Sequence, residues 1–325
     1  MITAIDIGYG YTKAQSSQGH QTIFPSIIGP AKEITFRPDL TSKNGSQVYT
    51  LQGSGYWAGQ YAQLQAKQPL SPLARERSDI IQEVLIAAAL DRVQAVGTVN
   101  VVTGLPVSWF KDREQLEQRI RKMPAVMVDG QRAGWVIGEV AVIPQPWGSL
   151  LNEVLDRNGQ IPKDKNLLAK GRIGVIDIGT FTTDYVLSDA MRYIAKGCGS
   201  VTSAMSKVQE HIGAAILSEH GLDLSNHQVA LAIMADGFRV RGQAKDISPY
   251  LMPAIDESWM PMKIMCRELW GNGGDIDTII ITGGGTPVFK SLIRELYPQA
   301  RVIVGDPVFG NVGGYLKQGR RNGWA

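Results

Sequence analysis

The chain has 325 residues and a mass of 35.4 kDa, which fits one large domain or, more naturally, two medium ones. It is 44% hydrophobic and 19% charged, which excludes a disordered chain, and no apolar run approaches the roughly 18 residues of a membrane span. The net charge of +3 without a long Lys/Arg run gives no strong signal for direct nucleic-acid binding.

Cysteine and histidine usage narrows the chemistry further. The two cysteines, Cys198 and Cys266, form no CxxC motif, and the four histidines belong to no HExxH or Cys/His set. Such a sequence is typical of a reduced, cytoplasmic protein without a zinc site. We therefore expect no membrane association and a cytoplasmic location.

The first predicted strand, residues 2–5, runs into the segment Ile5–Lys13, which combines several features of a phosphate-binding turn. Asp6 ends the strand, and glycines at positions 8 and 10 permit a tight turn that exposes backbone N–H groups. Such a turn can hold phosphate oxygens, a carboxylate suits hydrated Mg²⁺, and Lys13 can reach the phosphate charge. Taken alone, this pattern is also compatible with an ordinary hairpin.

The rest of the first half alternates strands and helices. We predict short strands at 12–16 and 21–25, an irregular sheet-and-loop region over 26–70 and a helix over 79–93 capped by Ser78 or Asp79. A strand at 98–102 ends in Thr103–Pro106, and a polar helix follows at about 108–122. A type I′ hairpin turns at Asp129–Gly130. A strand at 138–143, a helix from about 145 to 156 and a polar linker over 157–171 complete this half.

The second half restarts with a strand, a hairpin and a strand. Strands are predicted at 174–177, 182–187 and 191–195, followed by helices at 201–219, 225–235 and about 253–269. A buried strand at 278–282 ends in Gly283–Gly285. A helix at 287–296, a strand at 301–304 and a last helix near 307–317 follow. Strands alternating with helices predict an α/β fold.

One segment of the second half repeats the opening segment of the first. Ile176–Asp184 aligns without a gap with Ile5–Lys13, each position lying 171 residues further on. A repeat at about half the chain length indicates a duplicated domain. We expect two related domains around a nucleotide cleft, with the aspartates of the two copies, Asp6 and Asp177, on either side of one polyphosphate.

Five segments in order carry a resemblance: Asp6-x-Gly8 with Lys13, Gln145 at a helix start, Asp177-x-Gly179 with Asp184, Gly283–Gly285, and Asp306–Tyr315. The chain resembles the ATPase superfamily of actin, sugar kinases and heat-shock chaperones. Thr103–Pro106 and Asp306–Tyr315 look most like the prokaryotic ParM/StbA actin-like proteins, and the opening segment with Phe24–Ser26 is similar to their archaeal and plasmid relatives. The resemblance implies two duplicated RNase H-like (actin-fold) domains, 1–156 with 305–325 and 157–304.

The resemblance also implies a role for each motif residue. Asp6 and Asp177 would hold Mg²⁺ through water, and Gln145 would orient the attacking water, so these three form the expected catalytic set. Asp184 stands where chaperone relatives have a second metal-shell aspartate, although a simple strand-end aspartate fits the pattern equally well. The residues expected to bind ATP or ADP are Gly8, Tyr9, Gly10, Tyr11, Thr12, Lys13, Gly179, Thr180, Phe181, Thr182, Asp184, Gly283, Gly284 and Gly285.

The resemblance favours an ATPase that forms nucleotide-dependent filaments and segregates plasmid DNA through an adaptor protein. The alternative is a non-polymerising small-molecule kinase of the same fold, which needs a carboxylate base where this chain has Thr103–Pro106. Three aromatic groups, Tyr56–Trp57, Trp109–Phe110 and Trp270, are candidates for subunit contacts or for the core. Glycines in the segment Gly310–Gly314 are expected to loosen the last helix.

Overall fold

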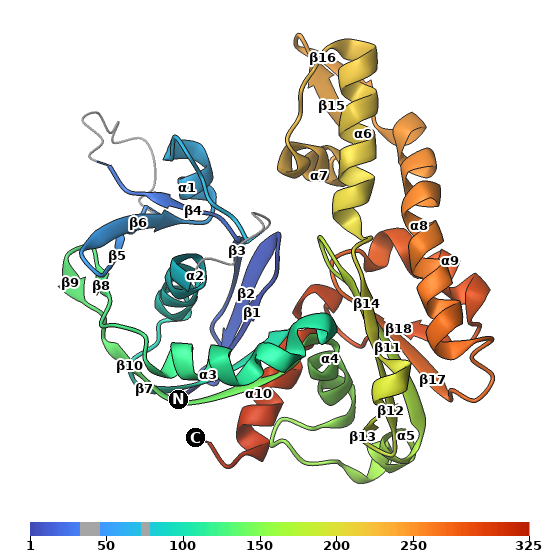
Figure 1. The fold of residues 1–325 in the computed structure, drawn as a ribbon, viewed down its shortest axis with the longest axis horizontal. Coiled ribbons are helices and arrows are strands. Elements are labelled where there is room, and N and C mark those ends of the chain that lie inside the picture. Colours follow the sequence, from blue (N-terminus) through green and yellow to red (C-terminus); the bar gives the residue numbers. More distant parts are fainter. Residues whose placement is uncertain (33–45, 73–78, 325) are drawn as a thin grey trace. The chain divides into compact units, whose positions relative to one another are not determined.

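The computed structural model describes residues 1–32, 46–72 and 79–324, and the chain divides into two compact units (Figure 1). Unit 1 comprises Met1–Lys170 and Ile303–Ala325, and unit 2 comprises Gly171–Val302. The residues 157–170 that precede unit 2 therefore group with unit 1. The expected N-cap Ser78 and part of the irregular region, residues 33–45, lie outside the described residues.

Unit 1 is built on a five-stranded sheet with the order β10-β7-β1-β2-β3. Its strands are β1 (Ile2–Ile7), β2 (Tyr11–Ser16), β3 (Gln21–Pro25), β7 (Gly97–Leu105) and β10 (Trp135–Pro144). The first three strands form an antiparallel meander, whereas β7 and β10 run parallel to β1. This arrangement brings the ends of β1 and β10 to one edge, because the carboxyl ends of parallel strands share a side of the sheet.

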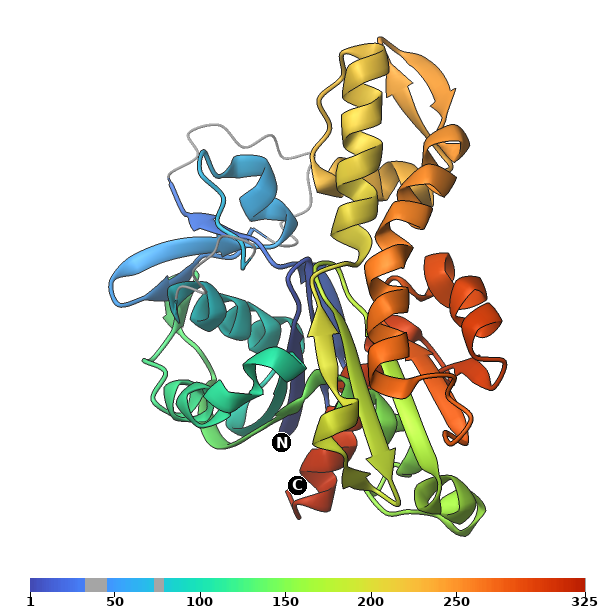
Figure 2. The ribbon, with the colours of Figure 1, turned by 45° about the vertical axis from the view of Figure 1, so that its right-hand side comes forward.

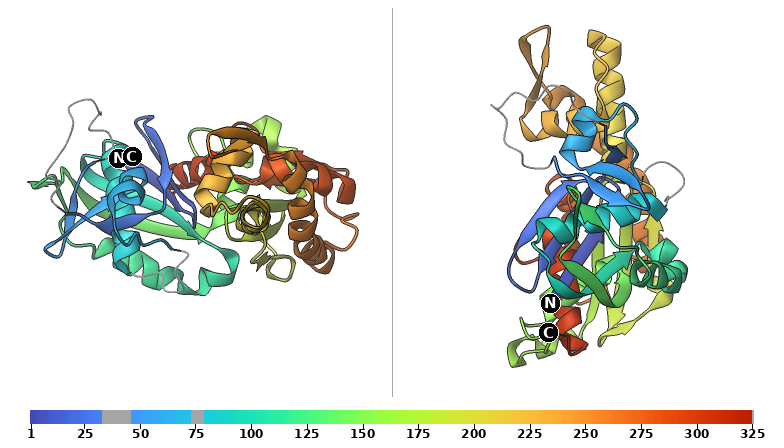
Figure 3. Two further views of the ribbon diagram at one scale, coloured as in Figure 1. Left: turned by 90° about the horizontal axis from the view of Figure 1, so that it is seen from above. Right: turned by 90° about the vertical axis from the view of Figure 1, so that its left-hand side faces the viewer.

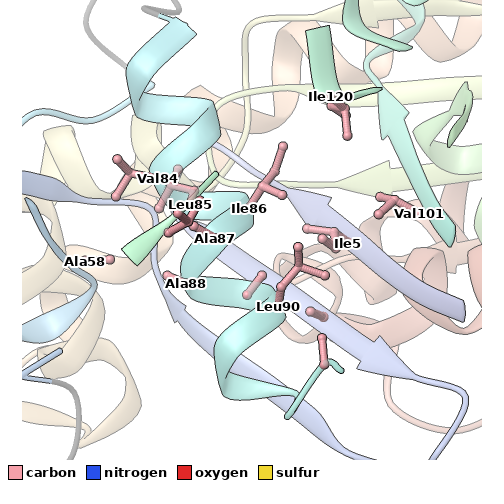
Figure 4. Close-up of a cluster of buried hydrophobic side chains, with 14 of the residues drawn as sticks. Ile5, Ala58, Val84, Leu85, Ile86, Ala87, Ala88, Leu90, Val101 and Ile120 are labelled. Atoms are coloured by element: carbon pink, nitrogen blue, oxygen red, sulfur yellow. The ribbon is translucent and has the colours of Figure 1, made fainter. Parts of the chain in front are cut away.

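Successive side chains of β1 point to opposite faces of this sheet. Ile5 packs into the large core with α2, while Ile2 and Ala4 pack against α10 on the opposite face. Asp6 follows the same alternation and therefore shares the face of Ala4. Figure 4 shows Ile5 close to the buried side chains of α2.

The helices of unit 1 cover both faces of the sheet. They are α1 (Gln60–Gln65), α2 (Asp79–Arg92), α3 (Arg113–Arg121), α4 (Gln145–Val154), α5 (Asn166–Lys170) and α10 (Gly310–Arg321). Residues 81–90 of α2 are all buried, because α2 contacts both the main sheet and a second, smaller sheet. The expected helix over 108–122 begins as a 3-10 helix, Val107–Asp112, and continues as α3.

The smaller sheet of unit 1 has the order β4-β6-β5-β8-β9. Its strands are β4 (Ile28–Pro30), β5 (Tyr49–Leu51), β6 (Ser54–Ala58), β8 (Met127–Val128) and β9 (Gln131–Arg132). Asp129 and Gly130 join β8 to β9 with φ values of 49° and 80°. Positive φ at both central residues confirms the predicted type I′ turn.

Unit 2 repeats the strand arrangement of unit 1. Its sheet has the order β13-β12-β11-β17-β18, with β14 also pairing with β12. The strands are β11 (Arg172–Ile178), β12 (Thr183–Asp189), β13 (Arg192–Tyr193), β14 (Gly199–Val201), β17 (Thr278–Thr282) and β18 (Ala300–Val302). As in unit 1, the first strand forms an antiparallel hairpin with the second and runs parallel to a later strand. The predicted duplication of an α/β domain is confirmed.

The helices of unit 2 are α6 (Met205–His220), α7 (Asn226–Met234), α8 (Ser248–Trp270) and α9 (Thr286–Leu296). In Figure 2, α6 and α8 extend from the sheet side by side, with the hairpin of β15 (Gly237–Val240) and β16 (Gln243–Asp246) at their far end. That hairpin was not predicted, because β16 is exposed along its whole length and shows no apolar alternation. The two chain ends lie close together within unit 1 (Figure 3).

Candidate functional site

The turns of the two hairpins share one backbone geometry. In the first hairpin, between β1 and β2, the Gly8 N–H donates to the Tyr11 carbonyl at 3.1 Å. In the second hairpin, between β11 and β12, the Gly179 N–H donates to the Thr182 carbonyl at 2.9 Å. A Cβ atom at either glycine would lie about as close to that carbonyl oxygen, at 2.9 and 3.0 Å, so a side chain would crowd each turn.

The carbonyl groups of both turns are fixed by neighbouring donors. Ser26 donates from its N–H to the Gly10 carbonyl at 2.9 Å and from its Oγ to the Gly8 carbonyl at 2.7 Å. In unit 2, the Ser206 N–H near the start of α6 donates to the Thr180 carbonyl at 2.6 Å. The N–H groups of Gly10 and Thr180 donate to no acceptor among the described residues. Each turn thus keeps a backbone donor available for an anion.

Asp6, Lys13 and Gln145 form a compact group at the first hairpin. Asp6 is 3% exposed, and its two carboxylate oxygens accept from Gln145 Nε2 at 2.9 Å and from Lys13 Nζ at 3.2 Å. Gln145 begins α4 directly after β10, which fixes its position beside the end of β1. The buried carboxylate is therefore compensated by one ammonium group and one amide.

The helix that carries Gln145 is locked against the last helix of the chain. A Cβ atom at Gly314 in α10 would lie 1.7 Å from the Gly148 carbonyl oxygen in α4, so these two backbones approach more closely than any side chain allows. Ser149 Oγ donates to Asn311 Oδ1 at 2.7 Å across the same contact. Gly314 thus permits tight packing of α10 on α4, and the expected loosening of the segment Gly310–Gly314 stays a prediction.

The second hairpin places two carboxylates on one face. Asp177 and Asp184 lie directly opposite each other in the β11–β12 ladder, and both are buried. Asp184 accepts hydrogen bonds from Thr182 Oγ1 at 2.8 Å and from Ser200 Oγ. Ser200 lies on β14, opposite Asp184, and nothing in its sequence surroundings predicts this contact.

The glycine segment after β17 packs against the second hairpin. Gly283 has φ +88°, and a Cβ atom there would lie 2.4 Å from Asp177 Oδ1. The Gly285 N–H donates to the Ile178 carbonyl at 2.9 Å. Gly284 has open space around its Cβ position, so its backbone can be approached by a ligand. The N-terminus of α9 follows at Thr286, which adds favourable electrostatics for an anion.

The structure thus brings the sequence-predicted residues together in two groups. Unit 1 assembles Asp6, Lys13 and Gln145 at the first turn, and unit 2 assembles the second turn with Asp184 and Gly283–Gly285. Sequence reasoning missed Ser26, Ser200 and Ser206 as residues that hold these groups. Ser26 carried a signal, since it belongs to a motif already set apart, Phe24–Ser26.

The chemistry of the carboxylates fits Mg²⁺. Carboxylate oxygens are hard donors of the kind Mg²⁺ prefers, and Mg²⁺ keeps most of its water ligands in proteins. No group of three or more His, Cys, Asp or Glu gathers as a metal cage in the part of the chain that the structure describes. A hydrated ion held through a few carboxylates fits this donor set better than a dehydrated one.

Two cavities, of about 540 and 500 Å³, lie elsewhere in unit 1, and neither is lined by a residue of the two hairpins. Of the candidate contact aromatics, Trp57 and Trp270 are buried in the cores, whereas Trp109 is 38% exposed. In the described residues, no helix combines the length and apolar character needed to cross a bilayer.

Comparison with known proteins agrees with this architecture. Residues 4–148 match the family of actin-like proteins, N-terminal domain, and residues 175–295 match the archaeal actin homologue MreB-like family, C-terminal. The two matched ranges together cover most of the chain. Residues 4–148 and residues 175–295 are thus each similar to a family of actin-like proteins.

Solved structures of that fold superpose over nearly the whole chain. A non-polymerisable quadruple mutant of pCBH ParM is 21% identical with a TM-score of 0.80, covering 98% of this chain and 99% of its own. An archaeal actin homologue in complex with ADP is 19% identical with a TM-score of 0.80 and the same coverage. A 15-stranded ParM filament from Clostridium botulinum is 22% identical with a TM-score of 0.79, again at 98% and 99%. No curated protein matches the sequence.

Proposed function

We propose that this chain is an actin-like ATPase that binds one Mg-ATP through both hairpins and hydrolyses it slowly. The observation that carries the proposal is the matched pair of turns, each with the same glycine hydrogen bond, an available backbone donor and a buried aspartate at the end of the preceding strand. Backbone donors and carboxylates of this kind serve phosphate and Mg²⁺ respectively. The structure of an archaeal actin homologue with ADP supports the assignment.

The residues of unit 1 supply the positioning that phosphoryl transfer requires. Lys13 adds positive charge beside the first turn, and the turn's N–H groups bind phosphate oxygens. Mg²⁺, when bound, neutralises charge on the phosphates. The amide N–H of Gln145 is directed to Asp6, which leaves Oε1 as the atom that accepts a hydrogen bond from water. An amide does not remove a proton at neutral pH, so Gln145 orients the water and hydrolysis is slow.

We further propose that nucleotide controls assembly of the chain into filaments in the cytoplasm, with plasmid DNA attached through an adaptor protein. Solved structures of the same fold include a ParM filament and a non-polymerisable quadruple mutant of pCBH ParM. A kinase function receives no support at the end of β7, where Thr103 is buried and Gly104 lies against Tyr315.

The experiment combines two readouts on the full chain. Phosphate release from Mg-ATP is measured together with light scattering and sedimentation in Mg-ATP and in Mg-ADP. The proposal predicts phosphate release without any added acceptor, and assembly that depends on which nucleotide is present. Phosphate transfer to a small-molecule acceptor, or the absence of turnover in water, would contradict the ATPase assignment. A chain that stays monomeric in both nucleotides at high concentration would remove the filament part alone.

A further inference from the structure

The positive charge of this chain is concentrated in two short segments of unit 1. Residues 157–170 and 303–325 together contain seven Lys or Arg and two Asp or Glu, whereas residues 1–156 contain 14 of each. Unit 2, residues 171–302, contains 12 basic and 14 acidic residues. Although the net charge of the whole chain is only +3, one region outside both hairpins is strongly basic.

These two segments are far apart in the sequence but pack against each other. Arg320 donates to the Arg157 carbonyl, and Arg321 Nη1 donates to the Gly159 carbonyl at 3.3 Å. Gly159 has φ +75°, and a Cβ atom there would lie 2.7 Å from the Arg321 backbone N, so the loop sits directly on α10. Figure 1 shows the loop after α4 passing beside the C-terminal half of α10. We call the surface formed by Arg157, Lys163, Lys165, Lys317, Arg320 and Arg321 the basic patch.

Of the carboxylates beside the basic patch, Asp156 and Glu153 accept from backbone N–H groups, whereas Asp164 is exposed between Lys163 and Lys165. Asp156 Oδ1 accepts from the N–H groups of Asn158 and Gln160 at 2.8 and 2.9 Å. Glu153 is buried and accepts from the Val304 N–H at 2.6 Å. Within the described part of the chain, no side chain of the patch forms an ion pair. The six cations of the patch therefore outnumber Asp164, the exposed carboxylate that lies among them.

The pKa of Lys317 is affected by cations from both segments. Burial lowers the pKa of Lys317, and the nearby cations Lys165 and Arg157 lower it further, against the opposing effect of Glu153 and Asp156. Lys317 Nζ donates to the Asn152 carbonyl at 2.5 Å. The cations of the two segments are thus close enough to repel one another, and a polyanion that contacts them relieves this repulsion.

We infer that the basic patch binds the phosphodiester backbone of a nucleic acid directly. The exposed or half-exposed neighbours of the cations include five side-chain amides, Asn158, Gln160, Asn166, Gln318 and Asn322, together with Asp164 and Leu167. Arg, Lys, Asn and Gln are the side chains that contact phosphate and sugar in nucleic-acid complexes. Leu167 is 87% exposed in the same segment, but a single apolar side chain does not form the apolar centre that a peptide-binding site needs. Contacts of this kind carry no base specificity, so binding is expected to be independent of sequence.

This contact could not be predicted from the sequence, because the chain has no Lys/Arg run. The cations come from a loop with a short helix and from the last helix, about 150 residues apart, and only the fold unites them. The inference stands apart from nucleotide binding, because no residue of the two hairpins belongs to the patch. A failure of one proposal therefore leaves the other intact.

The experiment measures fluorescence anisotropy of a labelled duplex of about 30 base pairs with the full chain, without nucleotide, between about 50 and 200 mM salt. The test variant is the triple substitution Arg157→Gln, Lys163→Gln, Lys165→Gln, whose three side chains form no ion pair with any described residue. The control removes the same charge from exposed positions of unit 2, Lys245→Gln, Lys263→Gln and Lys290→Gln. Thermal unfolding of both variants shows whether they remain folded.

The inference predicts binding that weakens steeply with salt, and a slope of log affinity against log salt that falls in magnitude by about three in the test variant. The control should keep the wild-type slope. Duplex DNA and duplex RNA of equal length separate the two sources of phosphodiester. Equal binding by the test variant and wild type, equal loss in the control, or stronger binding of an oligoglutamate peptide than of either duplex would overturn the inference.

Discussion

Lys13 and Asp184 occupy the same place in the two hairpins. Lys13 lies directly opposite Asp6 in the β1–β2 ladder, and Asp184 lies directly opposite Asp177 in the β11–β12 ladder. The first hairpin therefore pairs its aspartate with a cation, whereas the second pairs its aspartate with another carboxylate. Under the proposed function, this difference favours phosphate charge at the first turn and a cation at the second.

Lys13 should contribute more to the affinity for a ligand that carries more phosphate charge. Removing its ammonium group with Lys13→Gln should weaken ATP binding by about 10- to 100-fold, because hydrogen bonds to charged groups contribute roughly 1.5–3 kcal/mol. Binding of adenosine should change far less. Titration calorimetry with both ligands measures the difference, and Lys111→Gln at an exposed position serves as the control. Equal losses for ATP and adenosine would show that Lys13 acts on the fold alone.

Gln145 should affect turnover more than binding. Gln145→Ala removes the amide oxygen proposed to orient water, and we expect phosphate release to fall by about 10- to 100-fold, within the range of one positioned catalytic group. Nucleotide affinity should stay within a few-fold of wild type. Single-turnover phosphate release and calorimetry separate the two quantities. Unchanged turnover in this variant would remove Gln145 from the proposed mechanism.

Gly314 should be required for stability. Gly314→Ala places a Cβ atom against the Gly148 carbonyl and forces α4 and α10 apart, which should lower the free energy of unfolding by about 1–3 kcal/mol or more. Gly213→Ala in α6 is the matched control, since its Cβ would meet neighbours no closer than 3.6 Å. That variant should gain up to about 1 kcal/mol from helix propensity. Chemical denaturation measures both, and effects of the same sign would contradict the packing argument.

Two aspartates should give opposite pH profiles of stability. Burial raises the pKa of Asp91 in the folded protein. The contribution of Asp91 to the free energy of unfolding is therefore fully present below the pKa of the unfolded state, and it is lost as pH rises through the pKa of the folded state. Asp91→Asn should therefore gain stability relative to wild type as pH rises from about 4 to 7, while the Tyr49 hydroxyl keeps an acceptor. Denaturation at several pH values measures the gap.

Asp246 provides the comparison of opposite sign. Hydrogen bonds from the backbone and side chain of Ser248 lower the pKa of Asp246, so its contribution is present above the unfolded pKa and is lost as pH falls. Asp246→Asn should be less stable than wild type at neutral pH, and the difference should vanish on acidification. Parallel profiles for the two variants would show that these pKa shifts do not govern the pH dependence.

Local patterns explain what the sequence could predict. The repeated Ile-Asp-Ile-Gly segments place both hairpins and their aspartates, because strand alternation and glycine turns are local properties. The contacts of Ser200 with Asp184, of Gly314 with Gly148 and of the two basic segments depend on chain parts that meet only after folding. From sequence alone, a glycine in the middle of a helix is expected to destabilise that helix. Only the folded structure shows that a neighbouring backbone leaves no room for a side chain at that position.

Nucleotide stoichiometry tests the central claim most directly. Titration calorimetry with Mg-ATP should give one nucleotide per chain for wild type, and both Asp6→Ala and Asp177→Ala should weaken that single binding event, because each hairpin contributes to the same ligand. Two nucleotides per chain, or normal binding in either variant, would contradict the claim that the two hairpins serve one site.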